Sequence, residues 1–154
     1  DAHLKALAAK GGVIQMNAYG SYLKASKPNP ERQKAMSALF ASLREGGKIT
    51  AEKRADLLAK RREIDRLYPE TDRATFDDFM THMLHALEVV GPDHVGIGAD
   101  WDGGGGVVGM EDVVDLPKIT AALLKAGYSE ADVQKIWSGN ALRVLAAAEA
   151  GKAQ

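Results

Sequence analysis

The sequence predicts an α/β fold that is incomplete by itself, in which helices connect two parallel strands. Its segments follow the order helix, strand, long helical excursion, strand and two helices, the pattern of parallel-sheet proteins. Two buried strands alone leave their backbone edges and both faces partly uncovered. Yet 45% of the residues are hydrophobic and 27% are charged, as in a globular protein. We therefore expect these 154 residues to be part of a larger fold.

Charge and composition exclude several classes of function. The 20 Lys and Arg residues nearly balance the 21 Asp and Glu residues, which argues against a nucleic-acid-binding or polybasic membrane-binding domain. The chain has no cysteine, so disulfides, cysteine zinc sites and thiol catalysis are excluded. No apolar run reaches the roughly 18–20 residues of a transmembrane segment. The lack of cysteine fits the cytoplasm and the periplasm equally, so the compartment is left open.

The first elements are a short helix and a buried strand. Residues 2–10 predict the helix, which ends at Gly11-Gly12. Residues 13–19 form a mostly apolar run bounded by glycines, which favours a strand. A proline-containing loop is expected over residues 24–30.

A helical excursion over about residues 31–67 separates the two strands. Its first helix has one apolar stripe, formed by Met36, Leu39, Phe40 and Leu43, and ends at Gly46-Gly47. The second helix begins near Thr50, a suitable N-cap, and runs to about Leu67. Its dense charges favour a solvated face over an anion site. The pair predicts a protruding helical hairpin.

The next helix leads into the second strand. Thr75-Phe76-Asp77-Asp78 is similar to a capping box with Asp in place of Glu, and Gly91-Pro92 ends the helix. The apolar stripe between them comprises Phe76, Phe79, Met80, Met83, Leu84 and Leu87. After it, Val95, Ile97 and Ala99 alternate with glycines, which is typical of a tightly packed strand.

Two helices end the chain. Leu116, Ile119, Thr120, Leu123 and Leu124 mark the first, which stops at Gly127. Ser129 and Asp132 cap the second. Its predicted stripe contains Val133, Ile136, Trp137, Asn140, Ala141, Val144, Leu145 and Ala148.

Asp100 and Asp102 stand where the second strand should end. In parallel α/β folds this end of the sheet carries the chemistry. The two acids point to the same side if the strand is regular there. One acid can then serve a site while the other holds a loop. The alternative, that both only cap the following turn, has equal weight on spacing alone.

The end of the first strand offers further polar side chains. Asn17, Tyr19 and Tyr22 share the rim of Asp100 if the strands are parallel. Tyr22 suits a substrate pocket, since its ring packs and its hydroxyl forms hydrogen bonds. Tyr19 is expected to pack under the loop instead.

The histidines of the long helix are expected to be structural. His82 and His85 have the i, i+3 spacing of metal-binding helices, but apolar residues flank them, namely Met80, Met83 and Leu84. Hydrogen bonds at the boundary between the helix and the sheet are the favoured interpretation. His94 precedes the second strand, at the end opposite the chemistry, and is also expected to be structural.

Four segments resemble the membrane (renal-type) dipeptidase family. Residues 94–103 resemble its segment H-V-G-I-G-S-D-F-D-G, and residues 109–113 resemble its G-L-E-D-V. Residues 127–130 and 139–144 match its closing G-Y-S … G-N-x-L-R-V, and residues 12–19 resemble G-G-V-V-M-V-N-F-Y. The matches follow the family order along essentially the whole chain. The helical pair resembles an insertion of bacterial members.

The resemblance implies a zinc-dependent dipeptidase on a (β/α)₈ barrel of the TIM type. Two zinc ions would activate a water for attack on the peptide carbonyl of a dipeptide substrate. Residues 1–154 would be the C-terminal segment of that single domain, with its seventh and eighth strands. The metal ligands and the arginine that grips the substrate carboxylate would lie upstream, so no metal ligand is assigned in this chain.

The same resemblance implies roles for individual residues. Asp100 matches the eighth-strand aspartate that holds the substrate amino group and helps to move protons, so it is the catalytic and substrate-binding candidate. Tyr22 matches a tyrosine of the substrate pocket. Asn17 and Asp102 are expected to support the site, and the matched histidines are not ligands. The chain departs from the family pattern at Trp101, where Phe is common, at Ala18, which replaces an aromatic residue, and at Thr81, which replaces an acid. Trp101 and Ala18 are expected to alter the shape of the pocket.

The leading hypothesis is the C-terminal part of a dipeptidase that needs its upstream segment. Alone, the chain is expected to bind no zinc pair and to be inactive. Homodimerisation is implied by the resemblance only. One alternative is a catalytically inactive barrel homologue that acts as a binding or assembly subunit. A weaker one is an autonomous helical domain that binds partners through the hairpin.

Overall fold

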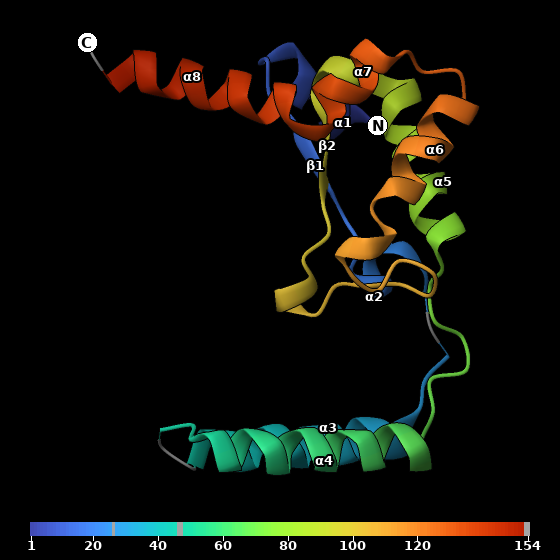
Figure 1. The fold of residues 1–154 in the computed structure, drawn as a ribbon, viewed down its shortest axis with the longest axis vertical. Coiled ribbons are helices and arrows are strands. Elements are labelled where there is room, and N and C mark those ends of the chain that lie inside the picture. The colour runs from blue at the N-terminus through green and yellow to red at the C-terminus, as the bar shows by residue number, and fades with distance from the viewer. Residues whose placement is uncertain (26, 46–47, 153–154) are drawn as a thin grey trace. The chain divides into compact units, whose positions relative to one another are not determined.

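The computed structural model describes residues 1–25, 27–45 and 48–152. The chain divides into two compact units (Figure 1). The first unit combines Asp1–Ala25 with Arg73–Gln154, and the second comprises Ser26–Asp72. In the parts of the chain that the structure describes, no helix is long and apolar enough to cross a membrane.

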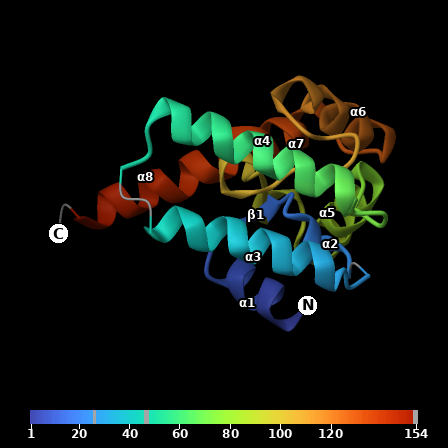
Figure 2. The ribbon, with the colours of Figure 1, turned by 90° about the horizontal axis from the view of Figure 1, so that it is seen from below.

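The second unit is a helical hairpin of α3 (Pro30–Glu45) and α4 (Ala51–Leu67), which lie side by side (Figure 2). Thr50 is the N-cap of α4 as predicted, since its hydroxyl accepts a hydrogen bond from Lys53 N at 3.3 Å. The predicted stop at Gly46-Gly47 lies outside the described residues. Leu39 is buried between the helices, whereas Phe40 and Leu58 are about half exposed. The hairpin therefore encloses a narrow apolar seam.

The first unit contains a two-stranded parallel sheet, as the sequence predicted. Strand β1 (Ile14–Asn17) pairs with β2 (Val95–Gly98). Ile14 lies opposite Val95, and Asn17 lies opposite Gly98. Each strand has only the other as a neighbour among the described residues, so one backbone edge of each is open.

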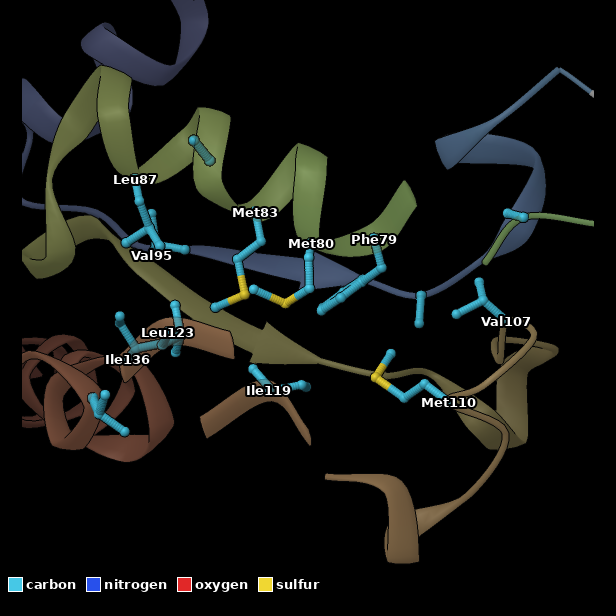
Figure 3. Close-up of a cluster of buried hydrophobic side chains, with 14 residues drawn as sticks. Phe79, Met80, Met83, Leu87, Val95, Val107, Met110, Ile119, Leu123 and Ile136 are labelled. Atoms are coloured by element: carbon cyan, nitrogen blue, oxygen red, sulfur yellow. The ribbon is translucent and has the colours of Figure 1, made fainter. Parts of the chain in front are cut away.

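Helices cover one face of this sheet. Helix α5 (Phe76–Val90) and helix α6 (Pro117–Lys125) direct side chains toward the strands (Figure 3). The largest fully buried side chains are Phe79, Met83, Met110, Ile119, Leu123, Ile136, Val95 and Val107. Burial of such side chains contributes about 1.5–3 kcal/mol each before entropy is counted. This layer fixes the sheet to the helices.

The opposite face is not covered by the described residues in the same way. Gln15 projects from it and is exposed, while its β2 neighbours on this face are Gly96 and Gly98. A Cβ atom at Gly96 would collide with the Gln15 amide, and one at Gly98 would lie 3.2 Å from Gln15 Cβ. The glycines of β2 thus leave room for a large polar side chain from β1.

The ends of α5 follow the prediction. Thr75 and Asp78 form a capping box, in which Thr75 N donates to Asp78 Oδ2 at 2.8 Å and Asp78 N donates to Thr75 Oγ1 at 3.2 Å. Gly91, with φ of 77°, ends the helix. The shorter helices α1 (Ala2–Ala9) and α2 (Gly20–Leu23) flank β1 in the sequence.

The last predicted helix is not one regular α-helix but three consecutive helical segments. It consists of α7 (Glu130–Gln134), a π-helical segment (Lys135–Gly139) and α8 (Asn140–Lys152). Its predicted stripe is buried at Val133, Ile136 and Asn140. Beyond Asn140 the stripe is largely exposed, and Leu145 is 55% exposed. The reason is that α8 extends away from the strands (Figure 1).

Candidate active site at the carboxyl ends of the strands

Asp100 has an unusual backbone at the carboxyl end of β2. Its φ of 59° and ψ of 34° place it in the left-handed region, and it is the one non-glycine residue with positive φ in the described part of the chain. A short 3₁₀ turn, Trp101–Gly103, follows directly. The regular strand has already ended at Gly98. The sequence predicted that Asp100 and Asp102 point to the same side only if the strand is regular there. Because the strand is not regular at these residues, that prediction does not apply.

The glycine run wraps around Asp100. Gly103 N and Gly105 N both donate to Asp100 O, at 3.1 and 2.7 Å, and Gly106 N donates to Ala18 O at 2.9 Å. A Cβ atom at Gly103 would collide with the Asp100 carboxylate, and one at Gly105 with the carbonyl of Ala99. These hydrogen bonds hold Asp100 in its left-handed conformation. The close packing of this turn explains the glycine run, so no phosphate-binding role is needed to explain it.

Asn17 connects the two strand ends. Its Nδ2 donates to Asp100 Oδ2 at 3.1 Å, and its Oδ1 accepts from Tyr19 N at 2.6 Å. The second bond fixes which end of the amide faces Asp100, because only an oxygen can accept from a backbone N–H. Asn17 therefore presents a donor to the Asp100 carboxylate, which remains exposed.

The two tyrosines occupy the neighbouring rim. Tyr19 lies under the glycine run as expected, since a Cβ atom at Gly104 would be 3.3 Å from its ring. The Tyr22 ring packs against the Tyr19 ring in a tilted arrangement, with ring centroids 4.9 Å apart and an interplanar angle of 55°. The Tyr22 side chain is 73% exposed. It is thus a supported but accessible ring beyond the end of β1.

An open hollow of about 450 Å³ adjoins the two acids. Its lining consists of Ile97, Ala99, Asp100, Trp101, Asp102, Leu116 and Trp137. Trp137 Nε1 donates to Thr120 Oγ1 at 2.9 Å, whereas the buried Trp101 Nε1 has no acceptor among the described residues. Apolar walls beside two carboxylates suit a ligand that has both an apolar part and a positive charge.

The histidines have the structural roles that the sequence predicted. His82 Nε2 lies 2.8 Å from Leu23 O, and His85 Nε2 lies 2.8 Å from Asp1 Oδ1. His94 Nδ1 lies 2.8 Å from Gly12 O. Each histidine connects its own segment to one distant in sequence.

The described residues do not by themselves fit a metal centre. Over residues 1–25, 27–45 and 48–152, no group of three or more His, Asp or Glu side chains is placed to hold a metal ion. Asp100 and Asp102 thus lack the further ligands that a zinc site requires. The zinc pair implied by the resemblance cannot be built from these side chains.

Two features of the site were not predicted from the sequence. Gln15 fills the space over the β2 glycines, a relation that depends on the strand register. Leu116 and Trp137 form walls of the hollow, although they lie in segments that follow the strand. The glycines at every second position of β2 indicate that a large side chain from a neighbouring strand lies over them. They do not indicate that this side chain is Gln15.

The family model described as membrane dipeptidase (peptidase family M19) matches residues 1–154. The chain belongs to the membrane dipeptidase family. Dipeptidase tcpJ of Claviceps purpurea is 40% identical over 77 residues, which are 49% of this chain and 18% of that protein. Dipeptidase ataJ of Aspergillus terreus is 45% identical over 65 residues, 42% of this chain and 16% of that protein.

A solved structure has a similar fold. The crystal structure of the probable dipeptidase PvdM from Pseudomonas aeruginosa matches with a TM-score of 0.60 and 27% identity, over 92% of this chain and 38% of that chain. The match confirms the predicted mixed α/β arrangement with two parallel strands. This chain thus spans well under half the length of the relatives that it matches.

Proposed function

We propose that this chain supplies one wall of a dipeptidase active site, with Asp100 as its catalytic and substrate-binding residue. The observation that carries the proposal is the exposed Asp100 carboxylate, which Asn17 and the glycine run hold at the carboxyl ends of both strands. Catalytic groups of parallel α/β barrels occupy this end of the sheet. Family membership favours hydrolysis of a dipeptide as the reaction.

The proposed roles follow from the side-chain chemistry. An exposed carboxylate accepts hydrogen bonds from a substrate ammonium group, and it can take up or release a proton at the reacting amide. Asn17 orients that carboxylate through its fixed Nδ2. The exposed Tyr22 ring, supported by Tyr19, provides an apolar surface and a hydroxyl for the substrate. Asp102, in the following turn, supports the loop.

The proposed enzyme also needs polypeptide outside the described residues. Both strands of the sheet have an open edge, and the hollow beside β2 has mainly apolar walls. An additional strand on β2, with apolar side chains, would satisfy the backbone edge and fill this space. The zinc pair of the family, when bound, would supply a metal-activated water. Its ligands would come from the added polypeptide.

The test is hydrolysis of dipeptides by the assembled protein that contains this chain, with Asp100→Asn as the decisive variant. We expect kcat/KM to fall by roughly 10²–10⁴-fold, because the carboxylate both binds substrate and exchanges protons. Glu88→Gln, an exposed acid near the end of α5, is the matched control and should retain most activity. The 154-residue chain alone should be inactive.

Two results would contradict the proposal. Asp100→Asn with the wild-type rate would remove Asp100 from the chemistry. An assembled protein that binds dipeptides by calorimetry without hydrolysing them would instead support the inactive binding subunit.

A further inference from the structure

The ends of the strands opposite Asp100 are held by a buried amide. Asn140, at the start of α8, is 3% exposed. Its Nδ2 donates to Pro92 O at 2.7 Å and to Val95 O at 2.8 Å. Both carbonyls belong to the segment from which β2 begins. A single side-chain amide therefore uses both of its N–H groups to fix the start of β2.

Arg143, one turn further along α8, connects the starts of both strands. Its Nη1 donates to Gly11 O at 2.7 Å, just before β1, and its Nη2 donates to Asp93 O at 2.8 Å, just before β2. The planar guanidinium holds its donors in a fixed relative geometry. It thus sets the offset between the two segments along the strand direction. We call Asn140 and Arg143 the register clamp.

Two further contacts support the register clamp. His94 Nδ1 lies 2.8 Å from Gly12 O, so a second side chain joins the start of β2 to the start of β1. Lys135 Nζ, in the π-helical segment, lies 2.8 Å from Asp93 Oδ1. The π-helical segment ends at Gly139 and places Asn140 directly after it.

The offset matters because the sheet is short. Only four residue pairs lie between the clamp and the site, from Ile14 opposite Val95 to Asn17 opposite Gly98. A slip by one residue would move every side chain of one strand to the other face. It would separate Asn17 from Asp100, which are now joined by the 3.1 Å hydrogen bond. The fixed ends thus determine whether the site residues meet.

We infer that Asn140 and Arg143 are positioning residues for Asp100, acting through the register of β1 and β2. The inference rests on the proposed function, since it concerns the residue proposed to act on the substrate. It explains a role for the Gly139–Val144 motif near the end of the chain, which lies at the end of the sheet opposite Asp100.

The first test uses the full 154-residue chain and the side-chain amide resonances of Asn17 in NMR spectra. Arg143→Ala is the main variant, because Arg143 is exposed and the chain should remain folded. We expect its Asn17 amide resonances to move and their hydrogen exchange to accelerate by roughly tenfold. Arg143→Lys should restore part of the wild-type spectrum, since Lys can still donate to one carbonyl. Asn140→Asp, which removes both donors, should have a larger effect.

The second test measures kcat and KM in the assembled dipeptidase. We expect Arg143→Ala to lower kcat by roughly tenfold, with a smaller rise in KM, because a displaced carboxylate is less effective in proton transfer. The matched control is Leu142→Ala, whose side chain is 60% exposed on the same turn of α8. It should leave kcat and the Asn17 resonances unchanged. Near-ultraviolet circular dichroism confirms that each variant is folded.

The outcomes separate the inference from the proposed function. Wild-type Asn17 resonances in Arg143→Ala would overturn the inference, and so would moved resonances with an unchanged kcat. If the wild-type assembled protein hydrolyses no dipeptide, the proposed function fails, and only the catalytic part of the inference fails with it. The Asn17 spectrum then still shows whether the clamp sets the register.

Discussion

Asp100 keeps a left-handed backbone because its surroundings compensate for the cost. For a residue with a Cβ atom, that conformation costs about 1–2 kcal/mol. Two backbone donors from the glycine run bind its carbonyl, and Asn17 binds its carboxylate. Strain of this kind persists only where several contacts act together, and it is concentrated at functional sites.

Gly105→Ala should disturb this turn through sterics alone. Gly105 is not among the glycines with positive φ, but a Cβ atom there would collide with Ala99 O and lie 2.7 Å from Asp100 O. We expect a loss of about 1–3 kcal/mol in the free energy of unfolding, measured by urea denaturation. Gly151→Ala, where a Cβ atom meets nothing within 4 Å, is the control and should cost nothing. Equal effects of the two substitutions would refute the steric account.

The two tryptophans of the hollow should respond differently to replacement by Phe. Trp137→Phe removes the hydrogen bond to Thr120 Oγ1 and should cost about 1 kcal/mol more than Trp101→Phe. The Trp101 N–H is buried and has no acceptor among the described residues, so its removal relieves a desolvation penalty. Urea denaturation of the 154-residue chain measures both. A larger loss for Trp101→Phe would show that its N–H is bonded in solution.

The sequence located these side chains but could not predict how they meet. The acids were expected at the end of the second strand and Tyr19 under the loop, because both follow from local patterns. The hydrogen bond from Asn17 to Asp100 joins residues 83 positions apart. It depends on the register, which single-strand patterns do not specify. The left-handed backbone of Asp100 likewise depends on how the glycine run folds.

At the scale of elements, helix starts were predictable because capping is a local interaction. Thr50, Thr75 and Ser129 all cap helices as expected. The π-helical segment was not predicted, since a 3.6-residue periodicity assumes a regular helix. It places Asn140 against the β2 carbonyls while Ile136 remains in the core. Tertiary contacts, which the local pattern does not contain, favour the extra residue in this turn.

The two capping boxes should make stability depend on acid. Hydrogen bonds from the Thr75 backbone N–H and hydroxyl lower the pKa of Asp78, and those from the Ser129 hydroxyl and N–H lower the pKa of Asp132. A carboxyl whose pKa is lower in the folded state adds stability above its unfolded value, about 3.9 for Asp. That stability is lost as the pH falls through the folded value.

We therefore expect the free energy of unfolding to be level above about pH 5 and to decline below about pH 4. Asp132→Asn should flatten part of this decline, because the side chain no longer ionises, whereas Leu142→Ala, which changes no ionisable group, should not. Urea denaturation between pH 7 and pH 2 measures the slopes. Identical acid slopes in wild type and Asp132→Asn would contradict a role for this box.

At the scale of the whole molecule, the two predicted strands led us to expect that the chain is part of a larger fold. Within residues 1–25, 27–45 and 48–152, the surfaces that no other element covers are the open edges of β1 and β2, the face that carries Gln15, and the exposed stripe of α8. The matched dipeptidase structure is more than twice as long as the part that this chain covers.

Hydrogen bonds and ion pairs of Arg32 join the two ends of the hairpin. Arg32, whose side chain is 13% exposed, bonds to Asp65 Oδ1 at 2.7 Å, Glu70 Oε1 at 2.9 Å and Tyr68 O at 3.1 Å. Burial opposes the charge of Arg32, but the hydrogen bonds and charges of Asp65 and Glu70 raise its pKa overall. These bonds join the start of α3 to the end of α4, so residues 26–72 form a module with local contacts of its own.

Replacing residues 26–72 by a short Gly-Ser linker should therefore leave the first unit folded. The core from Phe79 to Ile136 and the register clamp all lie within that unit, and a change in loop length costs little. We expect the free energy of unfolding of this unit to stay within about 0.5 kcal/mol of that in the whole chain, measured by near-ultraviolet circular dichroism in urea. The complementary experiment is Arg32→Ala in the whole chain. This substitution should destabilise the hairpin and leave the Asn17 amide resonances unchanged. Loss of the cooperative transition on excision would mean that the sheet depends on the hairpin, and the insertion would then be part of the folding core.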